Sequence, residues 1–247
     1  GNAVYGFLDG HDGPVAALYA DGSSGFIVSA SWDHTSKLWD LEKQCCALTF
    51  SGHTGAVRDC KFSDDGRIVF TAGDTTVRLW DRRSAGQVGV LRGHHNHVTC
   101  IDIAKKVIGG QVDSLLVLSG SYDNSALVWD LRLAIPVRTL VAHTAPVTSC
   151  CFTPDYSNAI TAGMDNVCRI FDISGCYSEP PFTMVNPPGR SKHLRMLKCA
   201  SSVITKCRLS PDGSFLATAS QDGILGITKL GPDTTRHMAV GRGAAVR

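Results

Sequence analysis

Residues 51–81 read SGHTGAVRDCKFSDDGRIVFTAGDTTVRLWD, and this stretch decides the fold. It begins with a Gly-His pair, places a valine four positions after the histidine, and ends with Trp80-Asp81. Asp74 stands six positions before the tryptophan. Short runs of Val, Ile, Phe and Leu lie between these landmarks, separated by turn sequences such as the Ser-Asp-Asp-Gly at 63–66. The pattern predicts short β-strands joined by tight turns, without a helical period.

The same landmarks recur along the chain at nearly constant spacing. Each histidine is followed by a tryptophan, or by a phenylalanine in the fourth copy, and the pairs are His11 and Trp39, His53 and Trp80, His94 and Trp129, and His143 and Phe171. The step from the Asp after each Trp to the next histidine is the same every time. A fifth copy keeps Asp222 but has Ala200 in place of the histidine and Thr228 in place of the tryptophan. Four strands in each unit of about 40–45 residues are typical of propeller blades.

On these residues the chain resembles the WD-repeat family over nearly all of its length. The resemblance implies an all-β fold, a β-propeller of four-stranded WD-repeat blades, for residues 1–247. Counting the landmarks gives five complete blades, expected at about 9–50, 51–91, 92–141, 142–185 and 199–240. We expect these to be part of a propeller of about seven blades, the number usual in the family.

The spacing also assigns a role to the ends of the sequence. Residues 3–8 are expected to be the outer strand of a preceding blade, and residues 241–247 the start of a further one. Expressed alone, such a window should aggregate or form oligomers, because its terminal blades would expose sheet faces and edges. The alternative is a small propeller, closed by pairing the N-terminal strand with the last blade.

The resemblance implies that His, Ser or Thr, Asp and Trp of one blade form a buried hydrogen-bond network. Such groups need partners when they are buried. The expected members are His11, Ser29, Asp33, Trp39, His53, Thr71, Asp74, Trp80, His94, Ser119, Asp123, Trp129, His143, Thr161 and Asp165. A His-Asp-Ser set also resembles a hydrolase triad, but a catalytic site does not need copies in step with a repeat. We therefore expect no catalytic residue and no enzyme.

Partners of this family often dock at the residue before the turn aspartate and at the residues flanking the first valine. The corresponding positions, expected to form one partner-binding rim, are Trp32, Arg58, His97, Thr99, Tyr122, Met164 and Gln221. Aromatic and arginine side chains are typical of interface hot spots. The sequence thus predicts a non-enzymatic scaffold that mediates protein–protein interactions in a multiprotein complex. The alternative is that Trp32 and Tyr122 only cover the blade edge.

Two other functions stay open. Substrate receptors of cullin-RING ubiquitin ligases resemble Trp-Asp-x-Arg at the end of a third strand, which would make Arg83 and Arg132 ligase-adaptor contacts. This motif is weak, because arginine is common there in unrelated WD-repeat proteins. An RNA-processing or ribosome-assembly factor is the third hypothesis.

The RNA hypothesis rests on the basic run Arg190–Lys198, within one of two insertions expected at about 104–114 and 174–198. Long loops of this kind are functional or disordered. A solvated loop is the alternative, because no aromatic residues are interleaved for base stacking.

Composition excludes several other classes. A net charge of +2 gives no general attraction to nucleic acid or to anionic membranes, and no apolar run is long enough for a membrane-spanning helix. The ten cysteines contain no Cys-x-x-Cys, which favours reduced thiols and a cytoplasmic or nuclear location. The histidines of the stretch 94–97 lack the acidic or cysteine ligands that would complete a metal site. We expect no metal, cofactor, membrane contact or small-molecule substrate.

Overall fold

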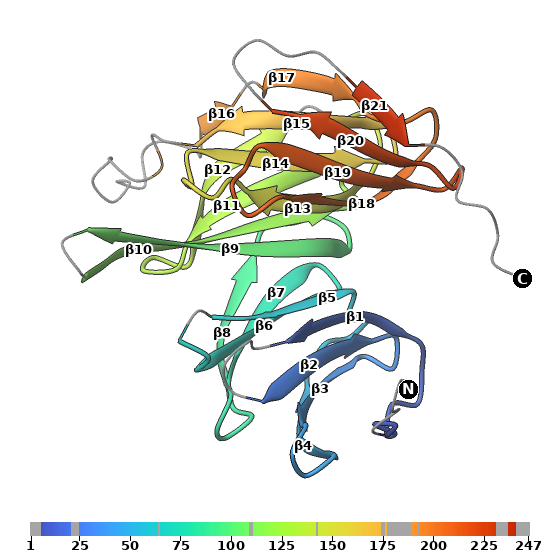
Figure 1. Ribbon diagram of the computed structural model, residues 1–247. Coiled ribbons are helices and arrows are strands. Elements are labelled where there is room, and N and C mark those ends of the chain that lie inside the picture. Colours follow the sequence, from blue (N-terminus) through green and yellow to red (C-terminus); the bar gives the residue numbers. More distant parts are fainter. Residues whose placement is uncertain are drawn as a thin grey trace, which may run out of the picture. The chain divides into compact units, whose positions relative to one another are not determined.

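A computed structural model describes residues 6–20, 25–63, 65–108, 111–141, 143–173, 176, 189–191, 193–230 and 237–240. The regular elements within these ranges are β-strands (Figure 1). They belong to two compact units, Gly1–Gly93 and His94–Arg247.

The first unit contains two four-stranded antiparallel sheets in its described residues. The first sheet consists of β1 (Val15–Ala20), β2 (Phe26–Ser31), β3 (Thr35–Asp40) and β4 (Cys45–Ser51), paired in chain order. The second consists of β5 (Asp59–Phe62), β6 (Ile68–Gly73), β7 (Thr76–Asp81) and β8 (Gln87–Arg92). The two sheets share one apolar core, to which Val28, Phe50, Val69 and Trp80 contribute. Val28 and Ala30 of β2, and Cys60 and Phe62 of β5, are alternate residues that face this core, as the pleat requires.

The second unit contains three antiparallel sheets, counted over its described residues. The first of them pairs β9 (Val98–Ile108), β10 (Gln111–Ser121), β11 (Ser125–Asp130) and β12 (Ile135–Val141). The next pairs β13 (Val147–Phe152), β14 (Asn158–Gly163), β15 (Val167–Asp172) and β17 (His193–Lys198). The last pairs β18 (Ile204–Leu209), β19 (Phe215–Ser220), β20 (Leu225–Lys229) and β21 (His237–Val240). The short strand β16 (Gly189–Ser191) adds to the edge of β12 in parallel.

Within the described chain there are thus five sheets with four antiparallel strands each. The predicted all-β fold of four-stranded blades is confirmed. Buried thiols and hydroxyls link successive sheets within each unit. Cys60, which is 1% exposed, donates to the carbonyl of Val28 at 3.4 Å, and Cys150 donates to that of Leu118 at 3.7 Å. No disulfide joins any of the ten cysteines, so the buried thiols of Cys60 and Cys150 act as small core residues that also donate a weak hydrogen bond.

The fourth blade ends later than the predicted boundary of 142–185. Its fourth strand is β17, which pairs with β15 and places Leu197 opposite Cys168. Leu197 is 4% exposed and packs in the core. The strand that pairs with the edge of β15 therefore comes from the sequence after the insertion. Arg195 and Lys198 therefore lie on a paired strand, which corrects the expectation of a continuous basic loop over 190–198.

The insertion expected at 104–114 also differs from the prediction of a longer turn. Strands β9 and β10 each have 11 residues, so the extra residues lengthen the hairpin. Gly109 and Gly110, between these two strands, lie outside the described residues. Of the predicted outer strand at 3–8, residues 3–5 lie outside the described residues and residues 6–8 form no strand. The predicted start of a further blade at 241–247 also lies outside them.

Candidate functional site

Four predicted residues of the first sheet form one continuous hydrogen-bond chain. Trp39 donates its indole N–H to Ser29 Oγ at 2.8 Å, and Ser29 Oγ lies 2.6 Å from His11 Nε2. His11 Nδ1 lies 2.6 Å from Asp33 Oδ2. An indole can only donate, so the Ser29 hydroxyl is free to donate to Nε2, which leaves the imidazole proton on Nδ1 for the carboxylate. The chain therefore runs in one direction, from tryptophan to aspartate.

The second and third sheets repeat this arrangement. In the third sheet His94 lies 2.8 Å from both Asp123 Oδ2 and Ser119 Oγ, and Trp129 donates to Ser119 at 2.8 Å. In the second sheet threonine replaces serine: His53 Nε2 and Trp80 Nε1 each lie 2.8 Å from Thr71 Oγ1. Nδ1 of His53 lies 3.1 Å from Asp74 Oδ2. The sequence-predicted residues of these sheets thus lie together in one set per sheet. Hydrogen bonds join the whole set in the third sheet, whereas in the second sheet His53 and Asp74 lie only at ion-pair distance.

The aspartate of each chain also holds the following turn. Asp123 Oδ1 accepts the backbone N–H and the hydroxyl of Ser125 at 2.9 and 2.6 Å, and Oδ2 accepts the N–H of His95 at 2.9 Å. Burial by itself would raise the pKa of Asp123, but these bonds and the adjacent imidazole hold that pKa well below its ordinary value. The same balance lowers the pKa of Asp74 to about 2. These carboxylates remain ionised in the folded state at neutral pH.

The fourth sheet contains a member that the sequence reading missed. His143 Nε2 lies 2.7 Å from Thr161 Oγ1, and its Nδ1 lies 2.9 Å from Asp165 Oδ1, but Phe171 cannot donate to the threonine. Arg169 Nη1 lies 2.7 Å from Asp165 Oδ2 and 2.7 Å from His143 Nδ1. A charged donor therefore joins the His-Asp end of this network, and Thr161 receives no bond from an indole. An arginine two positions before the aromatic position was the available signal, and Arg78 of the second sheet shares that position.

The fifth sheet keeps only part of the pattern. Asp222 accepts the backbone N–H of Ile224 at 3.2 Å, as the other turn aspartates accept theirs. Its other oxygen accepts the hydroxyl of Ser201 at 2.6 Å, one position after the place that histidine occupies in the other sheets. Thr218 donates to the carbonyl of Gly226 at 3.4 Å. The turn is therefore held without imidazole or indole.

The His-Asp-Ser geometry resembles a hydrolase triad, but its hydroxyls are not accessible. Ser29 is 2% exposed, Ser119 is 0% exposed, and each already accepts an indole N–H. A nucleophile must reach a substrate carbonyl, and no substrate can approach these oxygens. Over the part of the chain that the structure describes, no group of three or more His, Cys, Asp or Glu side chains is placed to hold a metal ion. Nor does a helix long and apolar enough to cross a membrane occur there.

In the first unit, two predicted rim residues contact each other. Trp32 directly follows β2 and is 53% exposed, with its backbone N–H bonded to the carbonyl of Pro14 at 2.9 Å. The guanidinium carbon of Arg58 lies 5.9 Å from the centroid of the Trp32 ring, a cation–π arrangement. The second sheet has Gly73 at the position of Trp32, where a Cβ would meet the carbonyl of Ala56 at 3.0 Å. This end of the unit therefore presents one large exposed aromatic ring with a cation beside it.

In the second unit, His97 and Tyr122 form the corresponding pair. Their ring centroids lie 6.5 Å apart at 82°, and the backbone N–H of Tyr122 donates to the carbonyl of His97 at 2.9 Å. Met164 makes the same backbone bond to Pro146 at 2.8 Å, and Gln221 makes it to Val203 at 3.0 Å. This backbone bond thus holds the residue before the turn aspartate at equivalent strand ends for Trp32, Tyr122, Met164 and Gln221.

Thr99 does not fit the predicted rim. It is 9% exposed, and its hydroxyl oxygen lies 2.6 Å from the carbonyl of Val147 in the next sheet. Thr148 makes the equivalent contact to Ile204 at 2.6 Å. The residue after the first valine of a strand therefore joins neighbouring sheets of this unit, and Thr99 offers little surface to a partner.

The family described as WD40 (WD domain, G-beta repeat) matches residues 3–40, 44–81, 85–130, 134–172 and 191–227. The chain belongs to the WD-repeat family. From the second repeat onward, each matched segment starts near the fourth strand of one sheet and continues through the following sheet. The last WD repeat starts just before β17 (His193–Lys198), in agreement with its place as a fourth strand.

Relatives of this WD-repeat chain carry names from different processes. It is 31% identical to Cell division control protein 4 of Saccharomyces cerevisiae over 69% of this chain and 24% of the relative. It is 31% identical to Nuclear distribution protein PAC1 of Arthroderma otae over 79% of this chain and 45% of the relative. It is 29% identical to the U5 small nuclear ribonucleoprotein 40 kDa protein of Dictyostelium discoideum over 72% and 49%. The chain spans less than half the length of each relative.

The two Trp-Asp-x-Arg motifs of the WD repeats differ in their side chains. Arg132 forms a two-pronged ion pair with its own Asp130, with Nε–Oδ1 and Nη2–Oδ2 distances of 3.0 and 2.5 Å. Arg83 bonds Asp81 through its backbone N–H at 2.6 Å, while its side chain is exposed. A guanidinium that is already paired has less to offer an adaptor protein. Of the two predicted ligase-adaptor contacts, Arg83 is the better placed for a partner.

The WD networks predict how stability depends on pH. Burial lowers the pKa of His53 below its ordinary value, while Asp74 partly offsets this and Arg78 adds to it. The unfolded chain therefore binds this proton more readily, and we expect stability to fall as the pH drops below about 6.5. The lowered aspartate pKa values predict a second loss between about pH 4 and pH 2.

Urea unfolding of the full chain at pH 7, 6, 5 and 4 measures the first loss. His53→Asn removes the titrating group and should flatten the profile between pH 7 and pH 5. The exposed His95→Asn is the matched control and should leave that slope unchanged. A wild-type profile without slope in this interval would contradict a neutral buried imidazole.

Proposed function

We propose that this chain is a non-enzymatic scaffold that binds other proteins in a multiprotein complex, in the cytoplasm or nucleus. The observation that carries the proposal is the exposure of Trp32 beside Arg58 at one end of the first unit. Tryptophan and arginine are the side chains most often found to dominate interfaces. The His97–Tyr122 pair is a second such surface, at the equivalent strand ends of the second unit.

Three further observations support this proposal. The only His-Asp-Ser sets among the described residues have buried hydroxyls, so their hydrogen bonds serve the blades and not a substrate. One relative is named as a 40 kDa protein of the U5 small nuclear ribonucleoprotein. The ten cysteines contain no Cys-x-x-Cys spacing, which favours a reducing compartment.

The experiment recovers partners from cells that express the tagged full chain and quantifies them by mass spectrometry. Arg58→Glu reverses the charge beside Trp32, and Tyr122→Ala deletes the aromatic anchor of the second unit. Together they should lower partner recovery about tenfold or more, because interfaces concentrate their energy in such anchors. Circular dichroism should be unchanged, since neither side chain belongs to a hydrogen-bond network described above.

The matched control is Arg83→Glu with Arg132→Glu, which tests the ubiquitin-ligase receptor hypothesis. Under the scaffold proposal this pair leaves most partners bound. If the partners lost only with the arginine pair are subunits of a cullin-RING ligase, the rim is rejected in favour of the ligase receptor. The observation that favours the ligase-receptor hypothesis is the exposed side chain of Arg83.

A further inference from the structure

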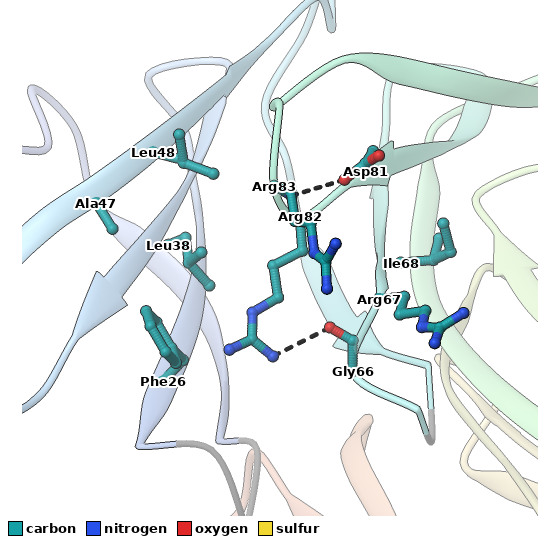
Figure 2. Close-up of a pocket in the computed structure, with 10 residues that line it drawn as sticks. All are labelled: Phe26, Leu38, Ala47, Leu48, Gly66, Arg67, Ile68, Asp81, Arg82 and Arg83. Carbon is teal, nitrogen blue, oxygen red and sulfur yellow. Dashed lines mark hydrogen bonds between the residues drawn. The ribbon is translucent and has the colours of Figure 1, made fainter.

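A groove of about 730 Å³ opens between the two sheets of the first unit (Figure 2). Its apolar surface comes from both β2–β4 and the start of β6. The lining apolar side chains are Phe26, Leu38, Ala47, Leu48 and Ile68. Leu38 is 2% exposed and belongs to the core, whereas Phe26, Leu48 and Ile68 are half-buried. The groove therefore has a firm apolar floor that remains in contact with solvent.

Arg82 forms one wall of this groove and is held in place from three sides. Its guanidinium carbon lies 4.3 Å from the centroid of the Phe26 ring and 5.7 Å from that of Phe62. Nη1 donates to the carbonyl of Gly66 at 3.1 Å, and the backbone N–H donates to the carbonyl of Arg67 at 2.9 Å. Stacking and hydrogen bonding thus fix a positive charge beside the apolar floor before any ligand arrives.

The mouth of the groove carries more positive charge. Arg67 and Arg83 line it with exposed side chains, and Asp81 is the one carboxylate among the lining residues that the structure describes. Asp81 already accepts the backbone N–H of Arg83 at 2.6 Å. Asp65 lies 4.0 Å from Arg67 on the exposed side, where solvent screens the pair. Three arginines against one engaged carboxylate make the groove attractive to anionic groups.

We propose that this groove binds an acidic peptide segment of a partner protein, with one bulky apolar side chain seated on Phe26, Leu48 and Ile68. Guanidinium groups bind carboxylates in a two-pronged geometry, so Arg67 and Arg83 select acidic residues on either side of the apolar anchor. An anion without an apolar side chain, such as a nucleic-acid backbone, would leave the floor exposed. Both features of the lining therefore specify the same ligand.

This surface is distinct from the Trp32 rim of the proposed function. Phe26 begins β2 and Trp32 directly follows its last residue, so the groove and the rim lie at opposite ends of the same strand. Substitutions at the two places can therefore be compared within one folded unit. Failure of one proposal leaves the other unaffected.

The test selects peptides from a phage-displayed random dodecapeptide library on the purified full chain, and on the variant Arg67→Glu/Arg83→Glu. We expect the wild-type chain to enrich sequences with Asp or Glu flanking Leu, Ile, Phe, Met or Trp, and the variant not to enrich them. Fluorescence polarisation with the best selected peptide should then show affinity weakened about tenfold or more by the charge reversal. Replacing the peptide's apolar anchor with serine should weaken binding similarly.

The matched control is Trp32→Ala/Arg58→Glu, which should bind the selected peptide as the wild type does. Circular dichroism establishes that both double variants fold. The proposal is overturned if no acidic-apolar sequence is enriched, or if the charge-reversed chain binds the peptide equally well. A competition experiment gives one more outcome that overturns the proposal. If a single-stranded oligonucleotide of equal charge displaces the peptide at the same concentration as the unlabelled peptide does, the groove recognises negative charge alone.

Discussion

Asp123→Ala is expected to lower the free energy of unfolding of the full chain by about 2–3 kcal/mol. The carboxylate accepts hydrogen bonds from the His94 ring, the His95 backbone and both donors of Ser125. Alanine leaves the buried imidazole and the turn without their acceptor. Thermal denaturation followed by circular dichroism should show a melting temperature lower by about 5–10 °C.

Two comparisons make the Asp123 result interpretable. Asp123→Asn keeps the size and one acceptor oxygen, so it should cost less than alanine. Glu42→Ala changes an exposed carboxylate and should have little effect on stability. If Asp123→Ala left the melting temperature unchanged while some catalytic rate collapsed, the structural role of this network would be wrong.

Trp129→Ala should be the most damaging single change in the described networks, at about 3–5 kcal/mol. Trp129 is 0% exposed, and its indole N–H donates to Ser119 at 2.8 Å. Alanine removes both the buried ring and the donor at the start of the hydrogen-bond chain. Urea unfolding of the purified chain measures the loss through the shift in its midpoint.

Trp129→Phe separates packing from hydrogen bonding. The fourth sheet already has Phe171 at this position, with its ring 0% exposed. Phenylalanine keeps a buried ring, but it deletes the N–H and is smaller than the indole, so we expect a loss of about 1–2 kcal/mol. A loss as large as that of Trp129→Ala would show that the donor, and not the ring, supplies most of the stability.

The repeat made most of the fold predictable, because each landmark has its partner at a fixed separation in the same sheet. His94 and Asp123 belong to the repeat with an insertion, yet the predicted pair lies at 2.8 Å. The insertions contain no landmark residues at fixed separations, so their strands could not be predicted in this way. The sequence from 174 to 198 contains apolar residues at several positions, and only pairing with β15 selects His193–Lys198 as the fourth strand.

The candidate site was less predictable, because exposure depends on the neighbouring sheet. Thr99 has the same position in its repeat as Arg58, but its short hydroxyl reaches the carbonyl of Val147 in the adjacent sheet. The longer arginine extends to the Trp32 ring instead. The groove had no sequence signal at all, since Phe26 and Arg82 come from different repeats and meet only when two sheets pack.

Each His-Asp network is completed within its own repeat, which bears on how such a protein can change over evolutionary time. In the fourth repeat Phe171 stands in place of tryptophan, and Arg169 of the same strand bonds Asp165. In the fifth, Ser201 bonds Asp222 where histidine is absent. Neither contact uses a residue from a neighbouring repeat. A substitution in the network of one repeat can therefore be compensated by a second substitution in the same repeat, without changes in the others. The single repeat is the unit within which compensating substitutions should be sought.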